Sequence, residues 1–408
     1  MTTQALCAPD ENRQLLWILA GLYLVQGLPV GLAFQAFPAM LRHAGASLEL
    51  VAMVPVAALP WVLKLLWAPL VDNYWSSRVG RRRSWIIPMQ ILSACVVFVM
   101  ASVGLNVNSA MPILVLIGVL SVLSSTQDVA TDGLAAERLK GKALGKANTL
   151  QVSCFMLGML VGGGLVMIGV EQIGFTFTFV LLGIIQLFCT LPILRWEEPA
   201  PCPHDIKVPG NLIKTFKRPF SFVMLMLAMC ATMGGAGLFG LTKLILIDAG
   251  WSMTDVGFLT GIGSTLMVVL GCIIAAPLMY KQTVWQLQLT GLSVLVFSSV
   301  GWGLINHYDL IIPQWVWLLT LSTGLSIGLN TVAAYTLVMQ FARAGNQPGV
   351  DVAAFQACQA LGDTVMGVGA VMLASIMSYG LASLLSLPVA MCCIGLVLFC
   401  RYRVALTI

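Results

Sequence analysis

The chain has 408 residues, of which 59% are hydrophobic and only 9% are charged. A soluble domain usually carries about 25% charged residues because its surface faces water, so this composition excludes an ordinary soluble protein. The net charge of +5 does not indicate a nucleic-acid partner, because most basic residues lie in short breaks between apolar stretches. We therefore expect an all-α membrane protein surrounded by lipid.

Apolar stretches long enough to cross a bilayer, about 20 residues each, recur along the whole chain. The first follows thirteen polar residues with no cleavage site, so we expect an uncleaved insertion signal. The longest loop, 196–219, separates an N-terminal bundle (1–195) from a C-terminal bundle (220–408), each of six helices. The twelve predicted spans are 15–40, 49–71, 85–104, 111–137, 147–169, 175–195, 221–247, 255–279, 285–305, 314–342, 352–378 and 381–400.

The basic residues predict the orientation, because positive charge accumulates in cytoplasmic loops. With both termini cytoplasmic, 18 of the 21 basic residues fall in cytoplasmic segments. Arg42 falls in a predicted outer loop, while Lys64 and Lys243 fall within spans. The pattern predicts a multi-pass membrane protein with both termini in the cytoplasm.

The two halves resemble each other, as expected of a duplicated six-helix unit. Residues 68–70 and 276–278 both read Ala-Pro-Leu, 208 residues apart, at the ends of the second and eighth spans. Two further pairs match at offsets of 205 and 203 residues: Gln151 with Gln356, and Gln127 with Asn330. We therefore predict two pseudo-symmetric bundles.

The loop between the second and third spans combines an acidic residue with an arginine cluster. Asp72 ends one helix, and Arg81, Arg82 and Arg83 precede the next. A carboxylate there can pair with the arginines, or face the positive end of a helix, and so hold the cytoplasmic side of a carrier shut. Alternatively, the arginines only anchor the topology.

The fourth span carries two carboxylates on a serine-lined face. Ser121, Ser124, Asp128 and Asp132 recur at spacings of three and four, which places them on one side of a helix. Carboxylates inside a membrane are costly unless they face water, a partner or a proton path. Asp128 is thus a candidate for substrate binding or proton coupling. The alternatives are an ion pair with Lys64, and a helix-end role for Asp132 with Arg138.

Polar residues also interrupt the first, seventh, tenth and eleventh spans. Lys243 either reaches the outer headgroups or points inward to meet an anionic substrate. Asp363 lies twelve residues after Asp351, roughly 18 Å along a helix, and therefore near the middle of the membrane. There it is either a proton-coupling group or a neutral packing group. The remaining candidates for the substrate site are Gln26, Gln127, Asn330, Tyr335, Gln356 and Gln359. The small-xxx-small patterns at 158–162 and 324–328 are interpreted as close helix contacts.

Three segments carry a resemblance to a known family. Residues 67–83 resemble the cytoplasmic loop motif of the major facilitator superfamily, in the long variant of the AmpG-type permeases. Residues 124–133 (SSTQDVATDG) resemble the (S/T)-Q-D-x-x-x-D segment of that family, which includes carriers of muropeptides and of acetyl-CoA. Residues 349–363 more closely resemble the siderophore-importing RhtX/FptX-type branch. Many muropeptide permeases have extra C-terminal spans, and we expect none here.

The resemblance implies an alternating-access carrier with the major facilitator fold, importing an iron-siderophore complex by proton symport. A muropeptide or other small metabolite is the alternative substrate. An enzyme is not expected, because His43, His204 and His307 fall in predicted loops without metal spacing, and the sequence has neither a nucleophile elbow nor a phosphate loop. We expect no cofactor, no resident metal and a monomer.

Overall fold

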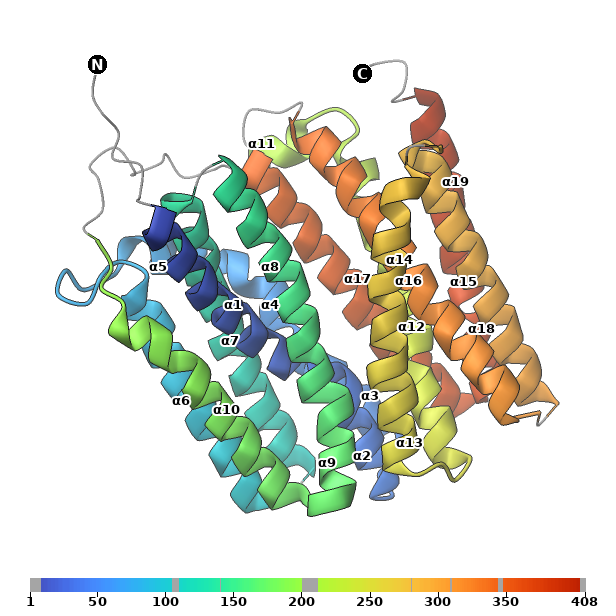
Figure 1. The fold of residues 1–408 in the computed structure, drawn as a ribbon. Helices are drawn as coiled ribbons and strands as arrows, with labels where there is room; N and C mark the ends of the chain where they lie inside the picture. Colours follow the sequence, from blue (N-terminus) through green and yellow to red (C-terminus); the bar gives the residue numbers. More distant parts are fainter. Residues whose placement is uncertain are drawn as a thin grey trace. The chain divides into compact units, whose positions relative to one another are not determined.

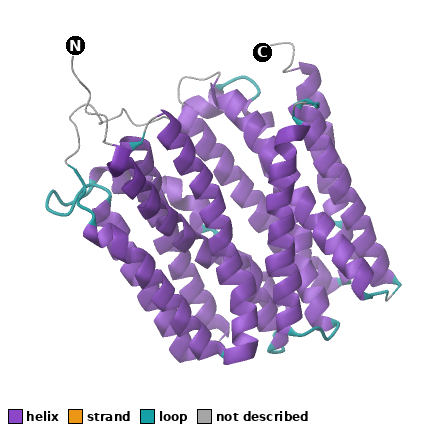
Figure 2. Ribbon diagram, in the orientation of Figure 1, coloured by secondary structure: helices purple, strands orange, loops and turns teal. Residues whose placement is uncertain are grey.

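The computed structural model describes residues 9–104, 110–139, 141–199, 212–279, 281–308, 310–343 and 348–403. Within these ranges the chain is almost entirely helical and contains no named strand (Figure 2). Three segments are π-helices, in which the backbone is locally wider than in an α-helix: η1 (Leu32–Ala36), η5 (Val161–Leu165) and η7 (Gly257–Gly263).

Twelve helices of the described chain are long and apolar enough to cross a membrane, which confirms the predicted fold class and the predicted spans. The observed limits lie within a few residues of the predicted ones. They are Arg13–His43, Leu48–Leu66, Arg83–Val103, Ala110–Ala135, Ser153–Ile173, Phe175–Arg195, Ser221–Asp248, Met253–Ala275, Val284–His307, Pro313–Val338, Asp351–Ile376 and Tyr379–Tyr402.

The chain forms two compact units. The first comprises Met1–Ala36 and Leu63–Val208, and the second comprises Phe37–Val62 and Pro209–Ile408. The end of the first span and the beginning of the second therefore group with the C-terminal part of the chain. Most of the predicted linker, residues 200–211, lies outside the described residues, so the division at 196–219 stays a prediction.

In the first unit α1 packs against α8, and α6 packs against both α7 and α10 (Figure 1). These contacts bring the apolar stripes of the helices together and leave polar side chains between α1, α7 and α8. The helices of this unit are α1 (Pro9–Gly31), α5 (Ala68–Asn73), α6 (Arg83–Val103), α7 (Ala110–Arg138), α8 (Gly141–Leu160), α9 (Val166–Ile173) and α10 (Phe175–Arg195), with the 3-10 segment η3 (Lys64–Leu66).

In the second unit α12 packs against α17 and α16, and α15 packs against α16 (Figure 1). Short segments from the first and second spans join it: α2 (Phe37–His43), α3 (Leu48–Ala52), the 3-10 segment η2 (Val54–Ala58) and, at the boundary, α4 (Pro60–Leu63). The others are α11 (Leu212–Lys217), α12 (Ser221–Asp248), α13 (Met253–Val256), α14 (Ser264–Leu278), α15 (Val284–His307), α16 (Pro313–Arg343), α17 (Pro348–Ile376), α18 (Tyr379–Leu384) and α19 (Ser386–Arg403).

The second span, predicted as one stretch over 49–71, is a series of short helical pieces. Three prolines cause the breaks, since proline lacks an N–H and fits only the first turn of a helix. Pro55 lies near the start of η2, Pro60 begins α4, and Pro69 lies near the start of α5. As a result, Lys64 sits in η3 between two proline-limited pieces. In the first span, by contrast, α1 continues through Pro29 and the irregularity follows at η1.

Glycines let two pairs of helices approach closely. A Cβ atom at Gly158 of α8 would collide with the carbonyl oxygen of Leu24 and the Cα of Gly27 on α1. A Cβ atom at Gly328 of α16 would collide with the backbone of Val268 on α14. Both glycines belong to the predicted small-xxx-small patterns, whose structural interpretation is thereby confirmed.

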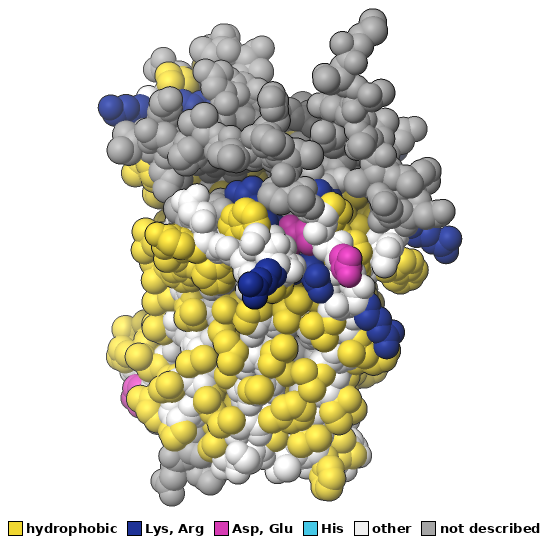
Figure 3. Space-filling view, turned by 90° about the vertical axis from the view of Figure 1, so that its left-hand side faces the viewer, with side chains coloured by type: hydrophobic (Ala, Val, Ile, Leu, Met, Phe, Trp, Pro, Cys, Tyr) yellow, Lys and Arg dark blue, Asp and Glu magenta, His cyan; other side chains and the backbone are white. Residues whose placement is uncertain are grey.

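The outer surface suits lipid rather than water. In Figure 3 hydrophobic side chains cover most of the surface that is drawn in colour, and lysine and arginine side chains lie towards one end of it. On α10 five of the exposed large hydrophobic residues are spaced by three and four, so they form one continuous stripe: Phe177, Leu181, Ile184, Phe188 and Leu191. A stripe of this kind on a helix of membrane-spanning length is typical of a lipid-facing surface.

Candidate functional site

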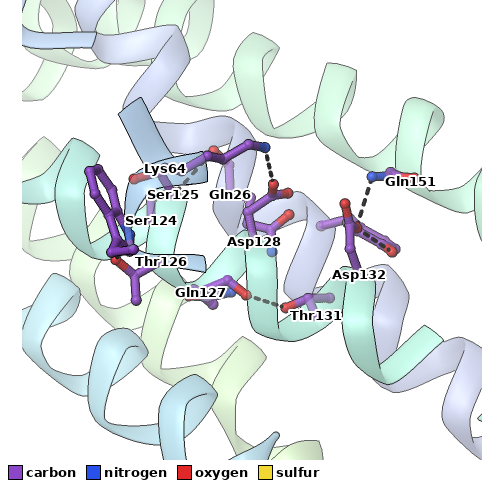
Figure 4. Close-up of polar contacts among 12 residues, drawn as sticks. Gln26, Lys64, Ser124, Ser125, Thr126, Gln127, Asp128, Thr131, Asp132 and Gln151 are labelled. Atoms are coloured by element: carbon purple, nitrogen blue, oxygen red, sulfur yellow. Dashed lines mark hydrogen bonds and ion pairs between the residues drawn. The ribbon is translucent and has the colours of Figure 1, made fainter. Parts of the chain in front are cut away.

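Asp128 and Lys64 form an ion pair inside the first unit (Figure 4). The Lys64 Nζ lies 2.5 Å from Asp128 Oδ2, and the two side chains are 18% and 7% exposed, respectively. Pairing offsets the cost of holding either charge away from water. The structure confirms the ion pair that the sequence left open. A role for Asp128 in transport stays a prediction.

Asp132 lies one turn further along α7 and has different partners. Its Oδ1 accepts hydrogen bonds from the Tyr23 hydroxyl, at 3.1 Å, and from Gln151 Nε2, at 2.9 Å. Arg138 instead donates to the carbonyl oxygen of Pro199, so the structure does not show the helix-end interaction of Asp132 with Arg138 that the sequence left as an alternative. Sequence reasoning missed Tyr23, although it lies three residues before Gln26 and therefore on the same side of α1.

The serine-lined face of α7 packs against α1. Ser124 Oγ donates to the carbonyl oxygen of Gln26 at 3.5 Å, and Gln127 Nε2 donates to that of Leu22 at the same distance. The Gln26 side chain is fully buried, and its amide has no hydrogen-bond partner among the described residues. In Figure 4 this amide lies close to the Lys64–Asp128 pair. The first unit thus gathers Gln26, Lys64, Asp128, Asp132 and Gln151 in one polar cluster.

Of the three arginines around the start of α6, two share one acidic partner and the third contacts backbone carbonyls. Arg82 Nη2 lies 2.5 Å from Glu137 Oε1 at the end of α7, and Arg81 Nη1 lies 3.2 Å from the same atom. Arg83 donates to the carbonyl oxygens of Ile193 and Leu194, at 3.2 and 3.0 Å. The acidic partner of the cluster in the structure is thus Glu137, which the sequence did not single out. The side chain of Asp72 lies outside the described part of the chain, so its pairing stays a prediction.

Glu198, just after α10, fixes the start of α6. Its carboxylate accepts hydrogen bonds from the backbone N–H groups of Arg82 and Arg83, both at 2.9 Å. These N–H groups have no partner within the helix, and a negative charge is favoured there. Gly80 permits the approach, because its φ is +111° and a Cβ atom would collide with Glu198. The arginine loop is therefore tied to the ends of α7 and α10.

We expect Arg82→Ala to lower the transport rate while most of the protein still folds, because Arg81 keeps Glu137 paired. Contacts that hold the cytoplasmic side of a carrier shut change the balance between its conformations without touching the substrate. Arg78→Ala is the matched control, since it removes an exposed charge from the same loop. Transport per folded molecule should fall for Arg82→Ala alone. If the two variants lower transport per folded molecule equally, the arginines only anchor the topology of the chain in the membrane.

In the second unit, two predicted site residues pack between helices. Asn330 Oδ1 accepts a hydrogen bond from Gln288 Nε2 at 2.8 Å, and its Nδ2 donates to Ser326 at 3.2 Å, so Asn330 links α16 to α15. Asp363 Oδ1 accepts a hydrogen bond from the Thr232 hydroxyl at 2.8 Å, which links α17 to α12. These contacts hold helices together, and Asn330 lies against α15 whereas its sequence counterpart Gln127 lies against α1.

Lys243 does not reach the outer headgroups. Its side chain is fully buried in α12, and its Nζ lies 4.5 Å from the centroid of the Phe239 ring. A cation over an aromatic face is stabilised by the ring's negative surface. The inward-facing alternative from the sequence is therefore the one that the structure shows. Tyr335, Gln356 and Gln359 come together elsewhere in this unit, around a small hollow between α12, α16 and α17.

Two ion pairs of the second unit were not foreseen. Arg42 meets Asp248 through two hydrogen bonds of 2.6 and 2.7 Å, and Tyr379 donates to the same carboxylate at 2.7 Å. Arg218 lies 2.5 Å from Asp351, which is fully buried. The first pair joins residues 206 positions apart, and no local sequence pattern signals such a contact.

Comparison with known proteins places these features in a family context. The family model described as acetyl-coenzyme A transporter 1 matches residues 15–175. The anhydromuropeptide permease of Escherichia coli K12 is 25% identical over 320 residues, which cover 76% of this chain and 64% of the permease. The AmpG 4 protein of Rickettsia conorii is 26% identical over 275 residues, which cover 63% of this chain and 66% of that protein. The chain thus spans at most about two thirds of these relatives.

Solved structures identify the fold. The D-xylose-proton symporter superimposes with a TM-score of 0.65 at 14% identity, covering 94% of this chain and 97% of the symporter. A mutant of the nucleoside transporter NupG superimposes with a TM-score of 0.64 at 11% identity, covering 94% of this chain and 99% of the transporter. These structural neighbours and the named relatives are transporters and permeases rather than enzymes. The chain has the major facilitator fold and is related in sequence to the AmpG-type permeases.

Proposed function

We propose that the chain is a secondary transporter that moves an anhydromuropeptide, or a closely similar metabolite, by alternating access coupled to protons. The observation that carries the proposal is the polar cluster around the Lys64–Asp128 pair, a charged group of residues within membrane spans. Intramembrane charges of this kind usually mark substrate or proton paths. The whole cluster lies within residues 15–175, which the acetyl-coenzyme A transporter model matches.

The chemistry of the substrate fits the residues of the cluster. An anhydromuropeptide joins a sugar to a short peptide, so it presents carboxylates, amides and hydroxyl groups. In our proposal a substrate carboxylate takes the place of Asp128 at the Lys64 ammonium. Asp128 is then released to accept a proton, with Asp132 one turn away as a second acceptor. Gln26 and Gln151 supply amides that can donate to and accept from the sugar and the peptide.

Position and orientation in the cell belong to the same proposal. We place the chain in a bacterial-type inner membrane, and the distribution of basic residues favours both termini and the 196–219 segment in the cytoplasm. The termini and residues 200–211 lie outside the described residues, so the argument rests on the sequence. An impermeant thiol reagent should fail to label a single cysteine placed at position 205 from outside the cell. Labelling there would refute the orientation.

Import of an iron-loaded siderophore is the second candidate function. It rests on the resemblance of residues 349–363 to the siderophore-importing branch. The named relatives above are instead of the AmpG type, and residues 124–133, which hold both acidic residues of the polar cluster, resemble a segment of that family. The muropeptide proposal therefore has the stronger support.

Uptake by cells separates the two candidates. Cells expressing the chain should accumulate a labelled anhydromuropeptide above the level of cells with an empty vector, and should not accumulate iron from a panel of labelled ferric siderophores. Arg78→Ala, which changes only an exposed loop residue, serves as the expression control. Accumulation of a ferric siderophore alone would replace the first proposal by the second, and accumulation of neither would contradict both.

A further inference from the structure

The polar residues in the middle of α17 lie on the side of the helix away from lipid. Gln356, Gln359 and Asp363 are half-buried and follow one another at spacings of three and four, so they share one side. The exposed large hydrophobic residues of this helix form a second stripe at spacings of four and seven: Leu361, Val365, Met372 and Ile376. Asp363 is two positions from both Leu361 and Val365, and two positions turn a helix by about 200°. The Asp363 side chain thus lies opposite the lipid-facing stripe.

The contact of Asp363 with α12 has a counterpart in the first unit that contains no polar side chain. Asp363 Oδ1 accepts a hydrogen bond from the Thr232 hydroxyl at 2.8 Å. Gly27 of α1 and Gly158 of α8 precede Thr232 and Asp363 by 205 residues each, and their backbones are in close contact. Two glycines are therefore enough to pack the equivalent pair of helices. This helix crossing does not require a carboxyl group, and a carboxyl group within a membrane span is costly.

Thr232 is the one polar partner of Asp363 among the described residues. The titratable groups of α17 and of the elements packed against it are, as far as their side chains are described, Glu49, Lys217, Cys230, Lys243, Asp248, Tyr335, Asp351, Cys358 and Tyr379. Asp248 and Asp351 are paired with arginines. Lys243 lies eleven residues after Thr232, roughly 16 Å along α12. No cation of the described chain therefore pairs with Asp363.

We propose that Asp363 binds and releases a proton during transport, as a second proton site that lies within the second unit. The inference rests on the proposed function, in which transport is coupled to protons. A proton delivered by water adds to the carboxylate, and the resulting carboxylic acid donates to the Thr232 hydroxyl, which reverses the hydrogen bond. The hydroxyl then donates to the carbonyl oxygen of Ala228, four residues earlier, as Thr242 of the same helix does to Leu238 at 2.8 Å. The hydroxyl and the carboxyl group thus keep a partner in both states.

The bound proton determines whether the site can be enclosed. An ionised carboxylate without a cation is costly to remove from water, whereas a hydrogen-bonded carboxylic acid is much less so. Asp363 is half-buried and faces away from lipid, so water reaches it in the conformation described. A conformation that encloses this side of α17 is then populated only with the proton bound. This requirement links proton binding to the conformational change of an alternating-access carrier.

The test measures how steeply accumulation depends on the pH gradient. Proteoliposomes that contain the purified chain take up a labelled anhydromuropeptide until the internal concentration is constant, with the membrane potential held at zero. Each coupled proton raises accumulation by up to about tenfold for a tenfold proton gradient. Asp363→Asn should therefore lower the ratio of internal to external substrate by about tenfold. Asp255→Asn, at an exposed position of α13, is the matched control and should keep the wild-type ratio.

A second readout separates proton binding from a structural role. Exchange of labelled for unlabelled substrate without a gradient should continue in Asp363→Asn, because exchange needs no net movement of protons. The double variant Thr232→Gly with Asp363→Gly copies the glycine contact of the first unit and also removes the carboxyl group. It should exchange substrate and show the same lowered accumulation ratio.

A wild-type accumulation ratio in both variants that lack the Asp363 carboxyl group overturns the second proton site alone. Loss of exchange together with accumulation in both variants also overturns it, because the residue is then structural. Accumulation by the wild type that does not respond to the pH gradient overturns the site together with the proton coupling of the proposed function.

Discussion

Asp128→Asn should strongly reduce the yield of folded protein. The substitution leaves the Lys64 ammonium without its charged partner, 2.5 Å away, in a site where neither side chain is more than 18% exposed. Breaking a buried ion pair by removing one member costs about 3–5 kcal/mol, a large part of the stability of a typical protein. The amount of monodisperse protein after detergent extraction measures the effect.

A double variant separates structural from functional loss. Lys64→Met combined with Asp128→Asn removes both charges and should restore most of the folded protein. Asp255→Asn is the matched control, because Asp255 is exposed near the start of α13. A wild-type yield for Asp128→Asn alone would show that the pair does not stabilise the fold.

Gly158→Leu should prevent the first unit from folding. The new side chain would collide with the backbone of Leu24 and Gly27 on α1, and a backbone cannot move aside as a flexible side chain can. Overpacking costs about 1–3 kcal/mol where neighbours can adjust, so we expect a loss of about 3 kcal/mol or more here. Thermal unfolding of any extractable protein, together with its yield, gives the measurement.

Gly118→Leu is the control for this prediction. Gly118 lies in the membrane-spanning part of α7, and a Cβ atom there would meet nothing within 4 Å. This variant should fold at close to the wild-type yield. If Gly158→Leu folds equally well, then α1 and α8 do not pack through their glycines as described.

The sequence was sufficient for the spans because membrane insertion depends on local properties. About 20 consecutive apolar residues signal a span whatever lies elsewhere in the chain, and all twelve predicted spans are found. The Lys64–Asp128 pair could also be predicted from the sequence, because two opposite charges at similar depth in the membrane have few other partners. Depth along two spans is itself a local property, counted from the ends of each apolar stretch.

Contacts that depend on how the helices are arranged in space could not be predicted from the sequence. Tyr23 reaches Asp132 from a helix 109 residues earlier in the chain, and Glu198 caps a helix that begins 115 residues before it. Nothing in the local pattern distinguishes these residues from ordinary span or loop residues. The alternative that joined Asp132 to Arg138 considered only neighbours in sequence, and it therefore overlooked Tyr23 and Gln151.

In the second span the prolines are visible in the sequence, but the positions of the helix breaks were not predicted. Each of its prolines is visible in the sequence, yet hydropathy treats residues 49–71 as one apolar stretch. Proline acts through the missing N–H and not through its hydropathy, so the positions of the breaks require the backbone. Their effect is to place Lys64 on a short 3-10 segment facing α7, which is how the ion pair forms.

In the proposed mechanism, the polar cluster of the first unit couples transport to protons. The direct test is accumulation of a labelled anhydromuropeptide in proteoliposomes, with and without an imposed pH gradient, normalised to folded protein. The wild type should accumulate the substrate above its external concentration only when the gradient is present. The Lys64→Met and Asp128→Asn double variant should fold but fail to accumulate it. Accumulation by the wild type that ignores the gradient, or full gradient-driven accumulation by the double variant, would contradict the claim.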